Sequence, residues 1–196
     1  MSKLFDNANA LHLLNNCQIQ IINSRDENYL QTYPILLKHI QNTCKKIDED
    51  SLTLISQLVY GWMPTILKSI NADKLRNKAI CNEALSLDAR NINSVIDFVE
   101  DKLFKELVNN SWIGLSKVLH FINPNVFPIW DSNVALCFSV KPDNKENYIR
   151  YIEFVHDNID ITIPNIDKLT LMSDVSKVRK IEFALFIEGR KLKSHS

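Results

Sequence analysis

Apolar residues recur every three or four positions through most of the chain, which is the period of an α-helix. The clearest example covers residues 92–107. Its apolar side carries Ile92, Val95, Ile96, Val99, Leu103 and Leu107, and its polar side carries Asp97, Glu100, Lys102 and Lys105. Alternating apolar segments occur only at 17–22 and 160–163, and short strands without a partner cannot satisfy their backbone. The sequence therefore predicts an all-α fold.

Further helices are predicted from the same spacing and from residues that start or end helices. A helix over 34–47 would have Pro34 in its first turn, and Asp50 would cap the next helix, which ends near Pro64. Another predicted helix starts at Asn91 or Asn93. The remaining predicted helices cover 71–87, 112–122, a stretch after Asp131, 144–159 and 175–187. No internal repeat or long linker divides the chain, so residues 1–196 are predicted to form one compact domain.

Composition agrees with a globular protein. The chain has 196 residues, of which 45% are hydrophobic and 23% charged, and this is enough to bury one core. No apolar run is long enough to cross a bilayer, and the first residues lack a basic segment followed by an apolar one. The sequence therefore predicts a cytoplasmic protein with no membrane partner, and we expect a monomer.

Cysteine and glycine usage argues against several cofactors. The four cysteines lie far apart, form no CxxC pair and have no histidine placed to complete a zinc site. They are Cys17, Cys44, Cys81 and Cys137, and iron-sulfur clusters need cysteines at shorter spacing. Only Gly61, Gly114 and Gly189 occur, so no glycine-rich loop can hold a nucleotide phosphate. The sequence predicts reduced, mostly buried thiols, no metal and no cofactor.

The charge of the chain is balanced overall but uneven locally. Lysine plus arginine equal aspartate plus glutamate at 23 each, so the overall field would not attract nucleic acid. Residues 177–196, however, carry six basic side chains against two acidic ones. The basic residues are Lys177, Arg179, Lys180, Arg190, Lys191 and Lys193. They indicate either a patch that faces phosphates or a solvated helix face with a frayed end.

The segment 111–135 differs from the rest of the chain. It predicts a turn at Gly114, a short apolar helix, a loop bracketed by prolines, and then Asp131 at the start of the next helix. An aspartate at a helix N-terminus accepts backbone N–H bonds, and the helix dipole favours its negative charge. Such a site would hold the Asp131 carboxylate in a fixed direction.

This segment resembles the helix-hairpin-helix superfamily of DNA glycosylases, which are all-helical enzymes that remove bases from DNA. The resemblance implies a hairpin at 112–117 that binds a DNA phosphate, with Gly114, Ser116 and Lys117 as contacts, and it implies that Asp131 faces the target nucleotide. Where the family's hairpin usually has two close glycines, this chain has one. Members that also cleave the strand place a nucleophilic lysine after the hairpin, and Lys117 is out of register with it, so we expect a monofunctional enzyme.

The resemblance also implies a mechanism. Breaking the bond between base and sugar develops positive charge on the sugar, and the Asp131 carboxylate would stabilise this charge or activate water. The base must first leave the stack and enter a pocket, where aromatic faces can stack on it. Candidate residues are Gln57, Tyr60 and Trp62 in a DNA-probing turn at 54–62, Trp112 and Trp130 for stacking, and His120, Ser132 and Asn133 for polar contacts.

Each of these residues also has a structural interpretation. In that interpretation, Asp131 is no more than a helix cap, and Trp112 and Trp130 are core residues. His120 is then a hydrogen-bonded core histidine, and Lys117 is a solvated side chain. The substrate would be a damaged or modified base, and one form of this hypothesis is a bulky modified cytosine of phage DNA, excised in antiviral defence. The alternative function is a non-catalytic helical module that binds DNA or another protein.

Overall fold

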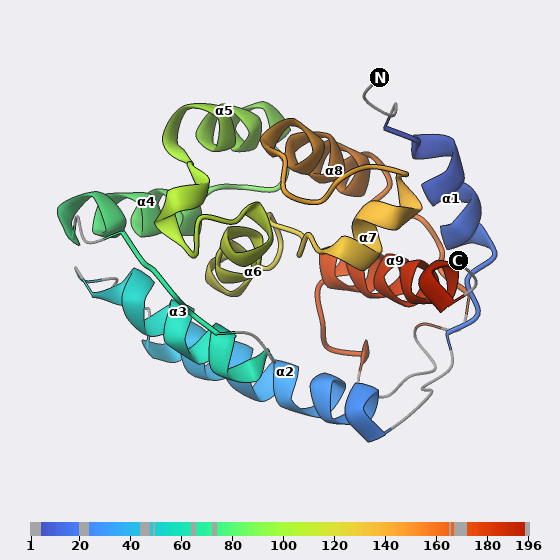
Figure 1. Cartoon of the computed structure of the whole chain (residues 1–196), viewed down its shortest axis with the longest axis horizontal. Coiled ribbons are helices and arrows are strands. Elements are labelled where there is room, and N and C mark those ends of the chain that lie inside the picture. Colours follow the sequence, from blue (N-terminus) through green and yellow to red (C-terminus); the bar gives the residue numbers. More distant parts are fainter. Residues whose placement is uncertain are drawn as a thin grey trace.

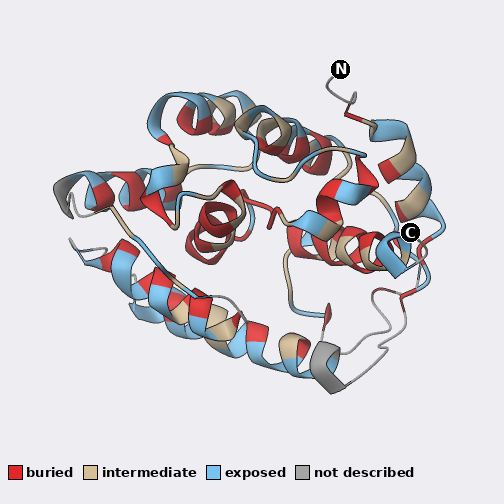
Figure 2. Ribbon diagram, viewed as in Figure 1, coloured by how far each residue is buried: buried red, intermediate tan, exposed pale blue. Residues whose placement is uncertain are grey.

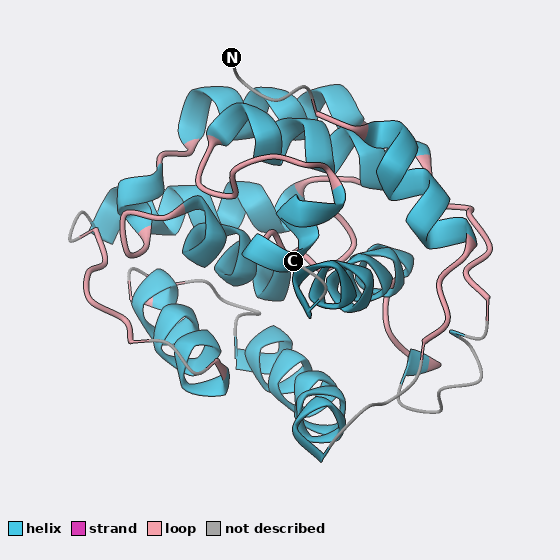
Figure 3. Cartoon of the chain, turned by 45° about the vertical axis from the view of Figure 1, so that its right-hand side comes forward, coloured by secondary structure: helices cyan, strands magenta, loops and turns pink. Residues whose placement is uncertain are grey.

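The computed structural model describes residues 5–19, 24–43, 48, 50–63, 66–71, 74–164, 166 and 172–194. These residues form α1 (Asn7–Asn15), α2 (Ser24–Thr43), α3 (Ser51–Trp62), α4 (Lys74–Ser86), α5 (Ile92–Lys102), η1 (Lys105–Leu107), α6 (Trp112–Ile122), α7 (Ser132–Cys137), α8 (Lys145–Asp157) and α9 (Lys177–Ser194). Within the described ranges, the only strand-like pairing is an isolated antiparallel bridge between Ile70 and Val108. Figure 3 accordingly shows helices and loops, and the predicted all-α fold is confirmed.

Helix α6 lies at the centre of the molecule, with the other helices arranged around it (Figure 1). It contacts α2, α3 and α4, whereas α9 contacts α1, α7 and α8. Figure 2 shows α6 as almost wholly buried, because its sequence is apolar on nearly every face. A hydrophobic core cluster includes residues from every α-helix in the described part of the chain.

Several predicted helix starts are confirmed. Helix α6 covers the predicted residues 112–122, and its cap Ser111 accepts the Gly114 N–H through its hydroxyl. Asn91 caps α5 by accepting the Ser94 N–H, and Asn144 caps α8 in the same way. Short polar side chains before apolar helices therefore marked these boundaries correctly.

Two predicted helices have different limits in the structure. Pro34 lies inside α2 instead of in a first turn, because the helix already begins at Ser24 and buries Leu30 and Tyr33 before reaching the proline. The helix predicted over 92–107 ends at Lys102, and Leu103 is extended. Leu103 and Leu107 are nevertheless buried, so the apolar pattern continues through a turn and η1.

Other predictions need smaller corrections. The turn predicted at Gly114 is wrong, because this glycine lies within the first turn of α6. Asp50 precedes α3 but makes no capping bond, and Asp48 exchanges hydrogen bonds with Ser51 instead. The helix predicted over 175–187 begins at Lys177 and continues to Ser194.

Some predictions concern residues outside the described ranges, namely Cys44, Ile47, Pro64 and residues 20–22. Of the two alternating segments, the described residues 17–19 and 160–163 form no strand. The three cysteines in the described ranges, Cys17, Cys81 and Cys137, are buried free thiols. None of the helices described here combines the length and the apolar character needed to cross a membrane.

Candidate functional site

A pocket of about 690 Å³ lies between α2 and α3 on one side and α9 on the other, with α6 and the start of α7 behind it. Its volume falls in the range of about 300–1,000 Å³ that is typical of ligand sites. The side chains that line it are Tyr29, Trp62, Met63, Lys117, Ile129, Asp131, Asn133, Arg179, Glu182, Phe183, Phe186, Arg190, Lys193 and Ser194. Of the residues predicted as functional, Trp62, Lys117, Asp131 and Asn133 therefore meet here.

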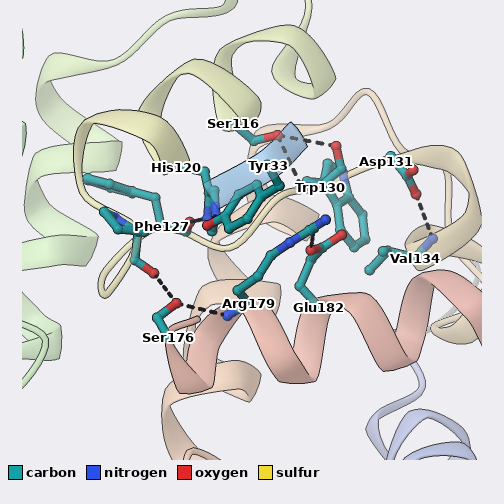
Figure 4. A network of polar contacts seen from close by, with 11 residues as sticks. Tyr33, Ser116, His120, Phe127, Trp130, Asp131, Val134, Ser176, Arg179 and Glu182 are labelled. Atoms are coloured by element: carbon teal, nitrogen blue, oxygen red, sulfur yellow. Dashed lines mark hydrogen bonds and ion pairs between the residues drawn. The ribbon is translucent and has the colours of Figure 1, made fainter. Parts of the chain in front are cut away.

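Asp131 occupies the cap position of α7 and is partly buried at the pocket wall. Its Oδ1 accepts the N–H groups of Asn133 and Val134, each at 2.9 Å (Figure 4). Among the described residues, no hydrogen bond or ion pair reaches Oδ2. The backbone thus fixes the direction of the carboxylate and leaves one oxygen available to the pocket.

The loop before Asp131 is fastened to α6 by one serine. The Ser116 hydroxyl is fully buried, accepts the Trp130 N–H at 3.0 Å and lies 3.2 Å from the Trp130 carbonyl oxygen. Ser116 was predicted as a DNA contact, but it does not line the pocket. Its bonds instead set the position of the residue that directly precedes the carboxylate.

Helix α7 is held from the other side by α9. A Cβ atom on Gly189 would collide with the backbone carbonyl of Asn133, so only glycine lets the two helices approach this closely. The Cys137 thiol adds a bond by donating to the Leu185 carbonyl oxygen at 3.2 Å. The position of Asp131 therefore depends on α6, through Ser116, and on α9, through Gly189.

Lys117 projects from α6 into the same pocket and is partly buried. Burial lowers the pKa of its amine, the positive charge of Arg179 lowers it further, and the negative charge of Asp131 opposes both effects. Lys117 is therefore not a fully solvated side chain, and its predicted contact with a DNA phosphate stays a prediction. It is a basic group beside the pocket carboxylate.

Arg179 and Glu182 form a buried ion pair on the α9 side of the pocket. Their side chains are only 6% and 3% exposed. The guanidinium lies over the Tyr33 ring at 4.7 Å from its centroid, and Figure 4 shows it extending from α9 toward Tyr33 and Trp130. Arg179 was predicted to lie in a phosphate-facing patch or on a solvated helix face, and its burial shows that neither interpretation holds for this residue.

Aromatic side chains form the wall opposite α9. Trp62 is partly exposed, and its indole N–H donates to the Thr32 hydroxyl at 3.1 Å, which fixes the ring plane. Tyr29 meets it edge-on at 5.3 Å between centroids, and Phe121 supports it at 5.4 Å. Trp62 is thus a rigid aromatic surface at the pocket.

The two other tryptophans lie away from this pocket. Trp130 is fully buried against Tyr151, and its indole N–H donates to the Pro142 carbonyl oxygen. Trp112 is 5% exposed and packs against Tyr148. Both are core residues, in agreement with their structural interpretation and not with a stacking role.

His120 is also a core residue. It is fully buried, accepts a hydrogen bond from the Tyr33 hydroxyl at Nε2 (2.6 Å) and donates one from Nδ1 to the Phe127 carbonyl oxygen (2.7 Å). The Phe127 carbonyl oxygen can only accept, so Nδ1 carries the ring proton and Nε2 is the acceptor. Burial lowers the pKa of His120 to about 3 and raises that of Tyr33 to about 12, which keeps both groups neutral. His120 joins α2 to the loop before Asp131.

The predicted phosphate-binding hairpin is organised differently from the expectation. A Cβ atom on Gly114 would collide with the Tyr60 hydroxyl, so this glycine serves the packing of α6 on α3. The Gly114 N–H already donates to Ser111, and the Trp112 N–H donates to Asp143 at 2.9 Å. The first turn of α6 is therefore capped from within the protein.

The turn that does precede α6 is formed by two asparagines. Asn109 and Asn110 have φ values of 58° and 50°, the left-handed region that asparagine tolerates better than most residues. The Asn109 side chain accepts the N–H groups of Lys68 and Ser69 and holds the loop after α3. The Asn-Asn pair in the sequence was the available signal for this turn.

The predicted DNA-probing turn contributes one residue to the pocket. Gln57 is exposed on α3 and Tyr60 is buried, and neither lines the pocket as Trp62 does. Ser132, also considered for polar contacts, is exposed. One face of α9 lines more of the pocket than this turn does, and it was not predicted as part of a pocket. Its residues are Arg179, Glu182, Phe183, Phe186, Arg190 and Lys193. Their spacing of three or four residues was the signal for that face.

No group of three or more histidine, cysteine, aspartate or glutamate side chains in the described ranges is arranged to hold a metal ion. Comparisons of the chain with family models, curated proteins and solved structures give no match. The geometry of these residues is therefore the basis for assigning a function.

Proposed function

We propose that this protein is a DNA glycosylase that hydrolyses the bond between a modified base and its sugar, with Asp131 as the catalytic carboxylate. The observation that carries this proposal is the state of Asp131. One oxygen is held by two backbone N–H groups, and the other is left to a pocket of about 690 Å³ with an aromatic wall. A carboxylate whose only role is to cap a helix does not need such a pocket.

The chemistry follows from this placement. As the bond to the base breaks, positive charge develops on the sugar, and a fixed carboxylate at that position stabilises the charge without reorganising. The free oxygen of Asp131 can also accept a proton from an attacking water molecule. Trp62 offers a rigid face on which an extruded base can stack.

Basic side chains around the pocket support DNA as the partner. Arg190 and Lys193 line it at the end of α9, and the Arg190 guanidinium lies 5.5 Å from the centroid of the Phe186 ring. These residues can neutralise phosphates on either side of an extruded nucleotide, although the whole chain has no net charge. DNA affinity should therefore fall steeply with salt.

The pocket volume also bears on the substrate. A single planar base does not fill about 690 Å³, so space remains for a substituent on the base. This favours a bulky modified base, such as a modified cytosine of phage DNA, over a small lesion, and we include antiviral defence in the proposal.

Lys117 allows a second form of the activity. A lysine whose pKa is lowered by burial, beside Asp131, can attack the sugar as a neutral amine and form a Schiff base. We propose the hydrolytic form, in which water is the nucleophile. Borohydride added during turnover should then trap no covalent complex with DNA, and a trapped complex that is lost in Lys117→Met would establish the lyase form.

Base release from a panel of DNAs tests the proposal. The panel contains oxidised and alkylated bases together with phage DNA rich in modified cytosines. We expect release of one class of base and formation of abasic sites. Binding to every DNA with a steep salt dependence but without release would contradict the enzyme and favour a non-catalytic DNA-binding module.

A further inference from the structure

The buried pair Arg179–Glu182 has hydrogen-bonding groups that no described residue satisfies. The Nη1 group of Arg179 donates to Oε2 of Glu182, and no described residue accepts from the Arg179 Nε–H, although this atom is buried. No hydrogen bond from the described residues reaches Oε1 of Glu182. Buried polar groups normally have partners, so a buried donor beside a carboxylate in a pocket wall indicates a ligand.

The balance of donors and acceptors in this pair specifies the ligand. An arginine fork has five N–H groups and no acceptor, and one of the two Glu182 oxygens is already occupied. The pair therefore offers several donors next to one free acceptor. The matching ligand edge has two neighbouring acceptors followed by one donor, and a phosphate, which has only acceptors, is disfavoured by the Glu182 charge.

We infer that Arg179 and Glu182 read the edge of an extruded cytosine-type base, with the guanidinium donating to O2 and N3 and the Glu182 carboxylate accepting from the 4-amino group. This inference rests on the proposed glycosylase function and assigns the recognition of a cytosine-type base to this pair of side chains. Cytosine has two adjacent acceptors and one amine on its pairing edge. Guanine has one acceptor and two donors, adenine has one of each, and thymine places a donor between two acceptors.

The assignment also leaves the modified position of the base accessible. A substituent on C5 of cytosine does not lie on the O2–N3 side of the ring, so it can extend into the remaining pocket. Asp131 lies on a different element from the pair, at the start of α7 rather than on α9. The sugar bond and the reading edge are on different parts of a nucleotide and can therefore be contacted by different helices.

Binding of two nucleosides tests the inference without requiring bond cleavage. The probes are 5-methyl-2′-deoxycytidine and thymidine, which share the 5-methyl group and differ at N3 and at position 4. Titration of the wild-type protein, followed by tryptophan fluorescence or calorimetry, should show a preference of about tenfold or more for the cytidine, since one well-placed pair of hydrogen bonds discriminates by this amount. Equal affinities, or no binding of either nucleoside, would overturn the inference.

The substitution Glu182→Gln sharpens the test. Glutamine can donate as well as accept, so it no longer rejects the 4-oxygen of thymidine, and the preference should fall about fivefold or more. The matched control is Glu188→Gln on the same helix, because Glu188 pairs with Lys191 and does not line the pocket. The control should keep the preference. A preference retained by a folded Glu182→Gln protein would contradict a reading role.

The two proposals can fail separately. Nucleoside preference in a protein that releases no base from any DNA would overturn the glycosylase and retain the reading pair as part of a binding site. Base release that is equally fast from cytosine-type and thymine-type nucleotides would retain the glycosylase and overturn the reading pair. Thermal melting of each variant shows whether a loss of preference is instead a loss of fold. The comparison of the two nucleosides on the wild-type protein does not depend on any variant.

Discussion

Asp131 and the Arg179–Glu182 pair face the same pocket but are held in different ways. Asp131 is partly exposed, and its position is fixed by backbone N–H groups at the start of α7. Arg179 and Glu182 are buried, and each is the other's main polar partner. A carboxylate held by backbone keeps its direction whatever ligand arrives, whereas a side-chain pair with unused donors is completed by a ligand. We therefore propose that the first region takes part in bond cleavage and that the second recognises the base.

The largest effect on stability is expected at Gly189, where α7 and α9, the helices that carry these two regions, meet. The substitution Gly189→Ala places a Cβ atom against the Asn133 carbonyl, so α7 and α9 must move apart. We expect the free energy of unfolding to fall by about 3 kcal/mol in urea denaturation, as for other overpacked contacts. Gly61→Ala is the matched control, because a Cβ atom there meets nothing within 4 Å, and it should stabilise α3 by up to about 1 kcal/mol. Equal effects of the two substitutions would contradict a tight α7–α9 contact.

The next effect concerns His120, which supports the Asp131 side of the pocket. Burial lowers its pKa from 6.5 to about 3, so the unfolded chain binds the proton more readily than the folded protein does. Stability is then fully present above about pH 6.5 and declines as the pH falls toward 3, by about 2 kcal/mol between pH 6.5 and pH 5. Urea denaturation of His120→Gln should show a flatter dependence on pH than that of the wild-type protein. Equal slopes for the two proteins would refute a neutral His120.

A smaller effect is expected for the serine that fastens the loop to α6. Ser116→Ala leaves the buried Trp130 N–H without an acceptor and should lower the free energy of unfolding by roughly 1–2 kcal/mol. Ser56 is the control, since its hydroxyl is buried and has no partner among the described residues, so Ser56→Ala should be neutral or slightly stabilising. If Ser116→Ala proved as harmless as Ser56→Ala, the loop before Asp131 would be held by packing alone.

The sequence predicted the fold class and part of the pocket for identifiable reasons. Helical spacing predicted α6 with its correct limits, and the position of Asp131 after a proline-bracketed loop predicted a capped helix. These are local properties, which a sequence pattern records directly. The start of α2 was missed because Pro34 was read as a helix start, although burial of the preceding residues extends the helix around it.

The second region could not be predicted because it depends on contacts between distant segments. The pattern on α9 showed a helix with basic residues, but it could not show that Arg179 is buried under Tyr33, which lies far away in the sequence. The same limit applies to Trp112 and Trp130, since an aromatic side chain suits a core as well as a pocket. Gly114 likewise matched a turn, although the glycine is required by the approach of Tyr60.

The most direct test of the account compares two aspartates that cap helices. Asp6 caps α1 as Asp131 caps α7, by accepting a backbone N–H at 2.9 Å, but Asp6 does not line the pocket. Both can be replaced by asparagine, which caps a helix about as well. On the DNA from which the wild-type protein releases a base, Asp131→Asn should lose about 100-fold or more of the rate at unchanged thermal stability, and Asp6→Asn should keep it. Equal rates for the two variants would reduce Asp131 to a helix cap and contradict the proposed catalysis.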